Sequence, residues 1–318
     1  MLTISNDFLN TFFNSPVKGK VHRLFQRLFY IFKHPRHISL ILGLIPSKLV
    51  PFNQKDRIVN IKYKIDVLRA LNLSYTPSNI LTNFYSYLGY IIYNSLNEVD
   101  QNFSDSLVEL QCIFLKDQYC AQEFLKSDSV ILDCGANIGM FSLWAHYLCP
   151  SAQIYSFEPT ESTFEILEKN IKENNLKDII HPFNVALGDK IQETKIRTTQ
   201  VGMGSDNFII DSMRNMQEYI SYNYNKEEIV QMITIDDFVI KNKLERVDFI
   251  KMDTEGYEKQ ILKGAQETIM KFHPIITCSA YHLLEDKIEI PKLVLEIEPN
   301  YKYRLEKRFE EDFIFWYS

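Results

Sequence analysis

The chain has 318 residues, of which 46% are hydrophobic and 24% charged, which suits one α/β domain with an extension and excludes a low-complexity chain. Its net charge of −6 is unevenly spread: residues 1–60 hold nine Lys and Arg against two Asp, so they carry +7 and the remaining residues carry −13. An acidic body argues against a nucleic-acid substrate, which would require a basic face near the site.

Residues 1–60 are predicted to form short basic helices. Within Lys20–Lys33, apolar residues recur at helical spacing with basic residues opposite them. Two interpretations of this helix stay open: its apolar stripe packs on the rest of the protein, or it lies on an anionic membrane surface. No apolar run approaches the ~20 residues of a membrane span. Met1–Asn10 lacks the basic start and apolar core of a secretory signal.

The cysteines indicate the compartment. None of the five is paired as Cys-x-x-Cys, and the histidines are scattered, so neither a disulfide framework nor a zinc site is indicated. We expect reduced, mostly buried thiols in a cytoplasmic protein, in peripheral contact with the inner face of a membrane if Lys20–Lys33 is interfacial.

Residues 61–127 show further helical patterns, over Asn79–Asn94 and Ser104–Lys116, and contain no motif that carries chemistry. We therefore expect a helical basic extension over residues 1–115, followed by the main domain over 116–318.

The main domain opens with Val130–Gly139, V-I-L-D-C-G-A-N-I-G: an apolar strand, a glycine-bounded loop and the start of a helix. Gly135 and Gly139 allow a tight turn and the close approach of a ligand. A dinucleotide fingerprint would need further glycines at Asn137 and Met140, and a phosphate-binding loop would need Gly-Lys-Ser/Thr. The loop therefore suits a nucleotide ligand without a pyrophosphate.

A second strand, Gln153–Phe157, ends at Glu158. An acid at the end of the second strand, about 20 residues after the loop, is placed to accept hydrogen bonds from ribose hydroxyls. A lone surface Glu is ordinarily only solvated, but its spacing from the glycine loop favours a role in binding.

From residue 128 strands and helices alternate, which predicts a mainly parallel sheet covered on both faces. Residues 199–228 interrupt the alternation, and we interpret them as a substrate-side lid or a disordered segment. The strands are predicted at 129–133, 153–157, 180–186, 194–198, 229–234, 247–252, 274–280 and 312–317, and the helices at 139–148, 160–175, 234–242, 257–271 and 288–298.

Six motifs in order over residues 115–318 resemble the FkbM-type methyltransferases, which are class I enzymes that use S-adenosylmethionine. The resemblance implies an α/β Rossmann-like fold with a mainly parallel seven-stranded sheet and helices on both faces. In this chain the helical N-terminal extension would precede it. The motifs are D-C-G-A-N-I-G (133–139), F-E-P (157–159), L-E-K-N-I (167–171), V-A-L-G-D (185–189), I-D-D-F (235–238) and K-M-D-T-E-G-Y-E (251–258).

The resemblance also implies positions for the cofactor. Glu158 would hold the ribose hydroxyls with Pro159 beside it, and Val185 and Ala186 would lie near the adenine. Asp253, at the end of the fourth strand, would face the reactive methyl group. The wall of the methionine and ribose pocket would come from Asp133, Gly135, Ala136, Asn137, Gly139 and Met140.

The catalytic candidates are Asp253, Glu255 and His282. Methyl transfer to a hydroxyl needs in-line placement of the two substrates and removal of a proton, and His282 is the best candidate base because its ordinary pKa suits neutral pH. Asp253 and Glu255 could instead bind Mg²⁺, which we do not favour. A family branch has the Tyr281-His282 pair, whereas many members have a Glu near that strand end, so roles tied to that Glu do not transfer.

We therefore predict an O-methyltransferase that uses S-adenosylmethionine and acts on a small-molecule or glycan hydroxyl, with no nucleic-acid partner. The alternatives are an N-methyltransferase, disfavoured because Asp253 begins Asp-Thr-Glu-Gly rather than Asp/Asn-Pro-Pro-Tyr/Phe, and a non-catalytic cofactor-binding module. A dinucleotide dehydrogenase ranks third because the loop lacks its glycines.

Overall fold

The computed structural model describes residues 84–87, 90–93, 109–199, 208–209 and 224–318. They belong to one compact unit, Thr82–Ser318. The predicted helix over Lys20–Lys33 lies outside the described residues, and the predicted boundary after residue 115 stays a prediction. Within the described ranges, no helix is both long enough and apolar enough to cross a membrane.

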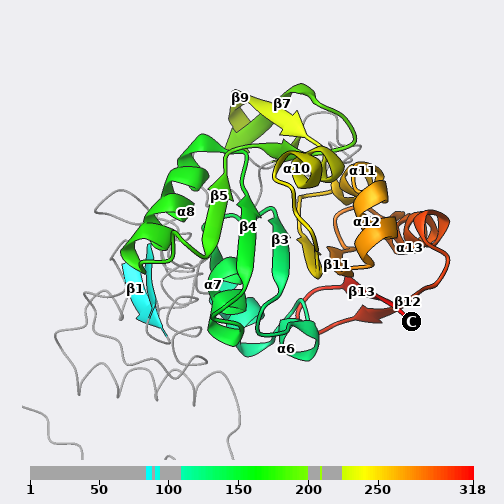
Figure 1. The fold of residues 1–318 in the computed structure, drawn as a ribbon. Helices are drawn as coiled ribbons and strands as arrows, with labels where there is room; N and C mark the ends of the chain where they lie inside the picture. Colours follow the sequence, from blue (N-terminus) through cyan, green and yellow to red (C-terminus); the bar gives the residue numbers. More distant parts are fainter. Residues whose placement is uncertain (1–83, 88–89, 94–108, 200–207, 210–223) are drawn as a thin grey trace, which may run out of the picture. The chain divides into compact units, whose positions relative to one another are not determined.

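A seven-stranded sheet organises this unit (Figure 1), as predicted. Its order is β12-β13-β11-β10-β3-β4-β5, and the five strands from β11 to β5 are parallel. β13 runs antiparallel to both of its neighbours. The strands are β3 (Val130–Cys134), β4 (Gln153–Phe157), β5 (Ile180–Phe183), β10 (Phe249–Met252), β11 (Ile275–Ser279), β12 (Tyr301–Glu306) and β13 (Asp312–Tyr317).

Helices connect these strands. After β3 comes α7 and after β4 comes α8, whereas α10 to α12 flank β10 and α13 follows β11. A short π-helical turn and α6 precede β3. The bounds are η3 (Gln111–Leu115), α6 (Ala121–Phe124), α7 (Met140–Leu148), α8 (Glu161–Glu173), α10 (Ile235–Lys241), α11 (Glu258–Lys263), α12 (Gln266–Phe272) and α13 (Asp286–Ile297).

The central strands are buried on both faces because alternate residues point to opposite sides. Leu132 of β3 and Ile250 of β10 belong to one core cluster with apolar side chains of α10 to α13. On the other face the ring of Phe249 stacks on Phe141 of α7, with ring centroids 6.0 Å apart. Lys251 shares the face of Phe249, which matters for the site below.

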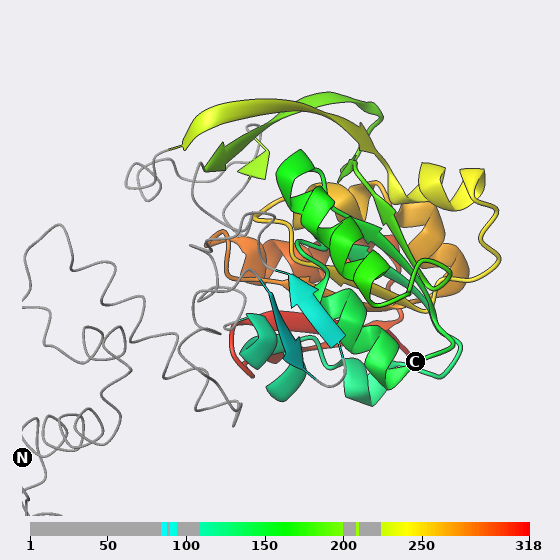
Figure 2. The ribbon, with the colours of Figure 1, turned by 90° about the vertical axis from the view of Figure 1, so that its left-hand side faces the viewer.

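A second sheet of four strands has the order β6-β9-β7-β8. The predicted strand 180–186 is corrected here, since β5 ends at Phe183 and Ala186 begins a strand of the second sheet. In Figures 1 and 2 the β7–β9 pair lies beyond the carboxyl ends of the parallel strands. Of the predicted lid, residues 200–207 and 210–223 lie outside the described residues. The bounds are β6 (Ala186–Leu187), β7 (Gln192–Thr199), β8 (Phe208–Ile209) and β9 (Tyr224–Ile233).

The helical prediction over Asn79–Asn94 is wrong for its described residues. They form an antiparallel pair, β1 (Phe84–Tyr87) and β2 (Tyr90–Tyr93). The backbone of Tyr93 donates to Asn170 Oδ1 at 2.6 Å, and Asn170 Nδ2 donates to the Tyr93 carbonyl at 2.9 Å. Asn170 of α8 thus fixes an extended chain whose Leu, Ile and Tyr content alone also suits a helix.

The structure differs from the predicted elements at two further places, and contacts between distant parts of the chain explain both. No strand was predicted over Tyr301–Glu306, which forms β12 although it carries three charges. Charged residues are tolerated there because β12 is an edge strand. The predicted helix 257–271 is interrupted between α11 and α12 at Gly264. A Cβ there would lie 2.0 Å from the Gly188 carbonyl oxygen, so this close contact between two backbones requires glycine.

Candidate functional site

Polar residues gather where four parallel strands end. Because β3, β4, β10 and β11 are parallel neighbours, their carboxyl ends share one edge of the sheet, the usual place of a ligand site in such folds. The loop Gly135–Gly139 begins directly after β3, and Glu158, Asp253 and His282 follow the ends of the other strands within three residues. The fold therefore brings together the main groups of residues that the sequence indicated.

The glycine loop is held tightly against the neighbouring strand ends. Gly135 has φ +77°, and a Cβ there would lie 2.0 Å from the carbonyl oxygen of Asp253. The amides of Gly135 and Ala136 both donate to the carbonyl of Phe157, at 3.1 and 2.9 Å. Gly139, at φ +93°, immediately precedes α7. Only glycine at 135 lets the loop lie this close to the end of β10.

Glu158 is anchored on the loop. Its Oε2 accepts the Asn137 amide at 3.1 Å, and its Oε1 accepts the Thr160 amide at 3.0 Å. Burial raises the pKa of Glu158 to about 7, against the lowering effect of these two amides. A carboxylate fixed beside a glycine loop, with lone pairs left over, can accept hydroxyl donors from a ligand.

Asp133 lies behind the loop rather than on its open side. It is fully buried, its Oδ2 accepts the Ser142 hydroxyl at 2.6 Å, and its Oδ1 lies 3.2 Å from Lys251 Nζ. Lys251 Nζ also donates to the carbonyl of Gly135 at 2.7 Å. The buried ion pair supports the loop from within the sheet, so Asp133 has a structural position where a pocket wall was predicted.

The other predicted pocket residues differ in exposure. Ala136 and Met140 are 3% and 1% exposed, and Ala186 is a core residue of β6. Pro159 and Val185 are partly buried. Ala136, Met140 and Ala186 therefore shape the site from the inside, whereas Pro159 and Val185 keep surface that a ligand could contact.

Asp253 is fixed by two tyrosines. Tyr119 OH donates to Asp253 Oδ2 at 2.5 Å, and Tyr281 OH donates to Oδ1 at 3.2 Å. Burial opposes ionisation of Asp253, but Lys251 and His282 hold its pKa below the ordinary value. Asp253 is thus a fixed anion, with a side chain 20% exposed at the mouth of the site.

His282 is buried among carboxylates, with only 1% of its side chain exposed. Its Nδ1 lies 3.0 Å from Glu258 Oε1, which also accepts the Thr254 amide at 2.8 Å. Its Nε2 lies 3.5 Å from Asp253 Oδ1 and 3.7 Å from Glu255 Oε2. The three catalytic candidates are therefore neighbours, and Glu258 belongs to the same group.

The charge of His282 argues against the predicted role as a general base. Burial would lower the pKa of His282, but Glu258, Glu255 and Asp253 together raise it to about 10. These carboxylates therefore favour the doubly protonated ring, which has no lone pair to accept another proton. Its position suits holding the carboxylates together.

Three residues of the site, Lys251, Glu258 and Tyr119, were given no role from the sequence. Lys251 had a signal, because a lysine within the apolar strand Phe249–Met252 must find a buried anion. Tyr119 gave no sequence signal, because it precedes β3 in a segment without a motif. Only the folded chain brings it next to Asp253.

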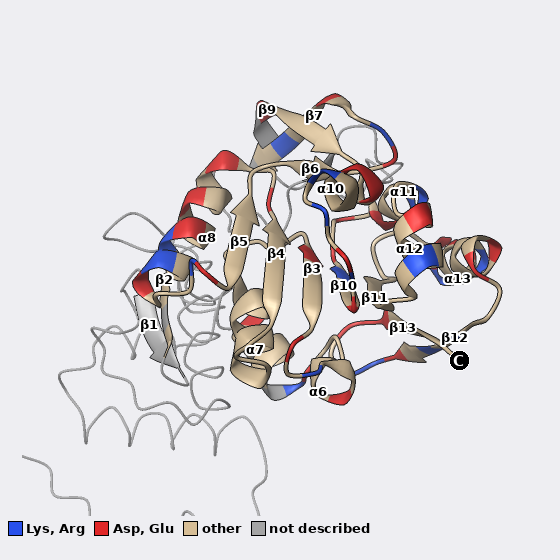
Figure 3. Cartoon of the chain, viewed as in Figure 1, with Lys and Arg blue, Asp and Glu red and all other residues tan. Residues whose placement is uncertain are grey.

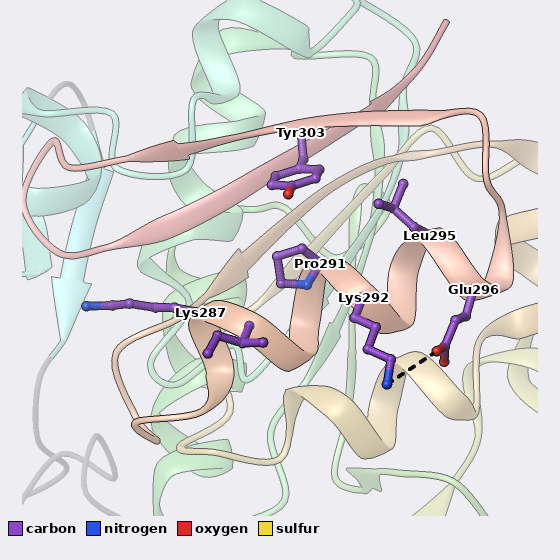
Figure 4. Close-up of a pocket in the computed structure, with 7 residues that line it drawn as sticks. Lys287, Pro291, Lys292, Leu295, Glu296 and Tyr303 are labelled. Atoms are coloured by element: carbon purple, nitrogen blue, oxygen red, sulfur yellow. Dashed lines mark ion pairs between the residues drawn. The ribbon is translucent and has the colours of Figure 1, made fainter.

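A shallow groove between α13 and β12 contains none of these residues. Figure 4 shows Tyr303 facing Pro291 across it, with the Lys292–Glu296 ion pair, 3.7 Å long, at its side. An ion pair between two exposed side chains one helical turn apart is ordinary surface structure. The groove therefore adds nothing to the assignment of the site.

Residues 133–312 match the family model described as the methyltransferase FkbM domain. Methyltransferase 1 of Beauveria bassiana is 26% identical over 165 residues, which are 49% of this chain and 65% of that protein.

Two further methyltransferases, one bacterial and one archaeal, are also similar to the chain. The 2-O-methyltransferase NoeI of Sinorhizobium fredii is 27% identical over 183 residues, 56% of this chain and 74% of that protein. The hexuronic acid methyltransferase AglP of Haloferax volcanii is 21% identical over 193 residues, 60% of this chain and 72% of that protein. The chain spans slightly less than two thirds of the length of the fungal protein and nearly three quarters of the other two.

Proposed function

Because the chain belongs to the FkbM methyltransferase family, we propose that it transfers a methyl group from S-adenosylmethionine to an acceptor. The observation that carries this proposal is the carboxylate of Glu158, fixed on the Asn137 amide at the end of the second parallel strand. Ribose hydroxyls that reach this edge of the sheet would find an acceptor already oriented by the glycine loop.

The acidic edge of the site suits a cationic cofactor. The sulfonium of S-adenosylmethionine supplies the reactive methyl group. Asp253 is held ionised by Lys251 and His282, and it would place a negative charge beside that sulfonium. The two tyrosines on Asp253 would keep the charge in position during transfer.

We propose that the acceptor atom is oxygen. NoeI is named a 2-O-methyltransferase and AglP a hexuronic acid methyltransferase, which favours a saccharide hydroxyl. The acceptor oxygen would attack the methyl carbon, the carbon–sulfur bond would break with its electrons left on sulfur, and the hydroxyl proton would pass to water. The sequence after Asp253 disfavours the alternative of an amino acceptor, as noted above.

A small-molecule or glycan acceptor fits the charge around the site better than a nucleic acid does. Figure 3 shows acidic segments near the ends of β3 and β10. Phosphate backbones are bound by clustered Lys and Arg. A poly-anion would meet repulsion from Asp253, Glu255 and Glu258 at this edge.

Calorimetry with S-adenosylhomocysteine tests the cofactor assignment. Glu158→Ala should weaken binding by about 1.5–3 kcal/mol, because hydrogen bonds to a charged acceptor are lost. Glu161→Ala is the matched control, an exposed acid in the first turn of α8. Equal binding by the wild type and the Glu158 variant would rule out this pocket, and binding of NADH instead would favour a dehydrogenase.

Radiolabelled cofactor tests the reaction. Incubation with hexuronic acids, neutral saccharides and glycolipid fractions should transfer the label to an oxygen of one of them. Label on a nitrogen would favour the amino-acceptor alternative. Tight cofactor binding without transfer to any fraction would favour the non-catalytic module.

A further inference from the structure

One buried nitrogen in the site lacks a hydrogen-bond partner. His282 Nε2 is buried and makes no hydrogen bond, although the side chain around it is only 1% exposed. It points at Asp253 Oδ1 and Glu255 Oε2, which at 3.5 and 3.7 Å are beyond good hydrogen-bond distance. Such an unsatisfied buried atom calls for an explanation, and a catalytic role or a bound ion is among the usual ones.

The distances from His282 Nε2 to the two carboxylate oxygens match those between ligand atoms around one metal ion. Two atoms each ~2.1 Å from a tetrahedral ion lie about 3.4 Å apart, close to both distances from Nε2. One oxygen each of Asp253 and Glu258 and one ring nitrogen of His282 also lie within 4.8 Å of one another. Asp253 and Glu255 each lie at the distance from Nε2 that a shared ion would set.

Glu258 fixes the histidine in the form that a metal requires. Glu258 Oε1 lies 3.0 Å from His282 Nδ1 and is itself held by the Thr254 amide. A ring that donates its Nδ1 hydrogen to a carboxylate offers its Nε2 lone pair to a metal, the usual arrangement around histidine ligands. Glu258 thus has the position of an orienting residue.

The site is closed on one side and open on the other. Glu258 and His282 have side chains 1% exposed, whereas those of Asp253 and Glu255 are 20% and 19% exposed. Catalytic metal sites keep such an open position for water or substrate.

We propose that this cluster binds one divalent transition-metal ion through His282 Nε2, Asp253 and Glu255, with Glu258 orienting the histidine. An imidazole ligand with two carboxylates suits Zn²⁺, Fe²⁺ or Mn²⁺ better than Mg²⁺, which prefers oxygen ligands and retained waters. Three carboxylates around one imidazole leave net negative charge for a divalent cation to neutralise.

The role of the ion rests on the proposed methyl transfer, whereas its binding does not. An acceptor hydroxyl bound at the open position would lose its proton to water more easily, and its oxygen would then attack the methyl carbon. The ion would thereby activate the acceptor hydroxyl for attack.

The test measures metal binding directly on the full-length chain after chelator treatment. Titration calorimetry with Zn²⁺ and electron paramagnetic resonance with Mn²⁺ should show one ion per chain that His282→Gln weakens at least 100-fold. Glu258→Gln should weaken it about 10- to 100-fold, as expected for an orienting residue. His273→Gln should have no effect, because His273 pairs with Glu298, not with the cluster.

Controls separate the outcomes. Glu255→Gln changes a partly exposed side chain, so it tests ligation even if the buried His282 variant does not fold. Binding that survives both the His282 and the Glu255 substitutions, or no binding by the wild type, overturns the proposal, as does Mg²⁺ bound as tightly as Zn²⁺. S-adenosylhomocysteine titrated into the same samples tests the proposed function separately, since cofactor binding without metal binding would refute only the metal site.

Discussion

Glu158→Gln should make the unfolding free energy of the cofactor-free protein fall less as the pH rises, and it should weaken the cofactor site. Burial raises the pKa of Glu158 from 4.5 to about 7, so the folded protein holds this proton more tightly than the unfolded chain does. The stability contributed by Glu158 is therefore fully present below pH ~4.5 and is lost as the pH rises to about 7. Glutamine has no such titration.

The size of the effect follows from the shift. A shift of about 2.5 pH units corresponds to about 3 kcal/mol in total, of which about 2 kcal/mol falls between pH 5.5 and 8. The difference in unfolding free energy between the Gln variant and the wild type should grow by that amount over this range. For a domain of this size it would appear as roughly 4–8 °C in melting temperature.

Thermal and urea unfolding of the two proteins at pH 5.5, 6.5, 7.25 and 8 measures this difference. Any constant loss of hydrogen bonding to the Asn137 and Thr160 amides cancels, because only the change with pH is compared. Glu161→Gln, an exposed substitution on α8, is the matched control. A flat profile for Glu158→Gln would refute the inference that burial perturbs this carboxyl.

The same group predicts the pH dependence of the cofactor site. If ribose hydroxyls donate to the Glu158 anion, S-adenosylhomocysteine should bind up to about tenfold more weakly for each pH unit below 7. The Gln variant should bind weakly at every pH. A wild-type affinity that did not change between pH 5.5 and 8 would place the ribose elsewhere.

Three further predictions concern support of the site and the N-terminus. Gly135→Ala should cost several kcal/mol in unfolding free energy, since the new methyl group would collide with the Asp253 carbonyl and φ is positive; an unchanged melting temperature would contradict this. Lys251→Met should cost about 3–5 kcal/mol by leaving Asp133 buried and unpaired, and adding Asp133→Asn should recover part of the loss. If Lys20–Lys33 lies on membranes, the full chain should co-sediment with anionic liposomes, less so at high salt, and a chain starting near residue 60 should not; if that shorter chain aggregates instead, the helix packs on the protein.

Local patterns in the sequence determined the core of the fold. Two signals lie within short segments: the strand, glycine loop and helix that begin at Val130–Gly139, and the acid after the second strand. They can be recognised locally because the spacing of strand, loop and acid along the chain already indicates a nucleotide site. Burial on both faces made the parallel strands readable as apolar runs. The free, buried cysteines were also expected, and all five are found so.

Tertiary structure decided what depends on partners distant in the chain. The β1–β2 hairpin takes its extended form from contacts with Asn170, and the break at Gly264 comes from the Gly188 backbone. The charges in the site also depend on residues distant in the chain. His282 has an ordinary pKa as an isolated residue, and only the fold surrounds it with Asp253, Glu255 and Glu258, which together determine its proton and leave its Nε2 facing two carboxylates. The sequence shows which residues can carry charge, but their electrostatic energies depend on the distances between them, which only the folded chain sets.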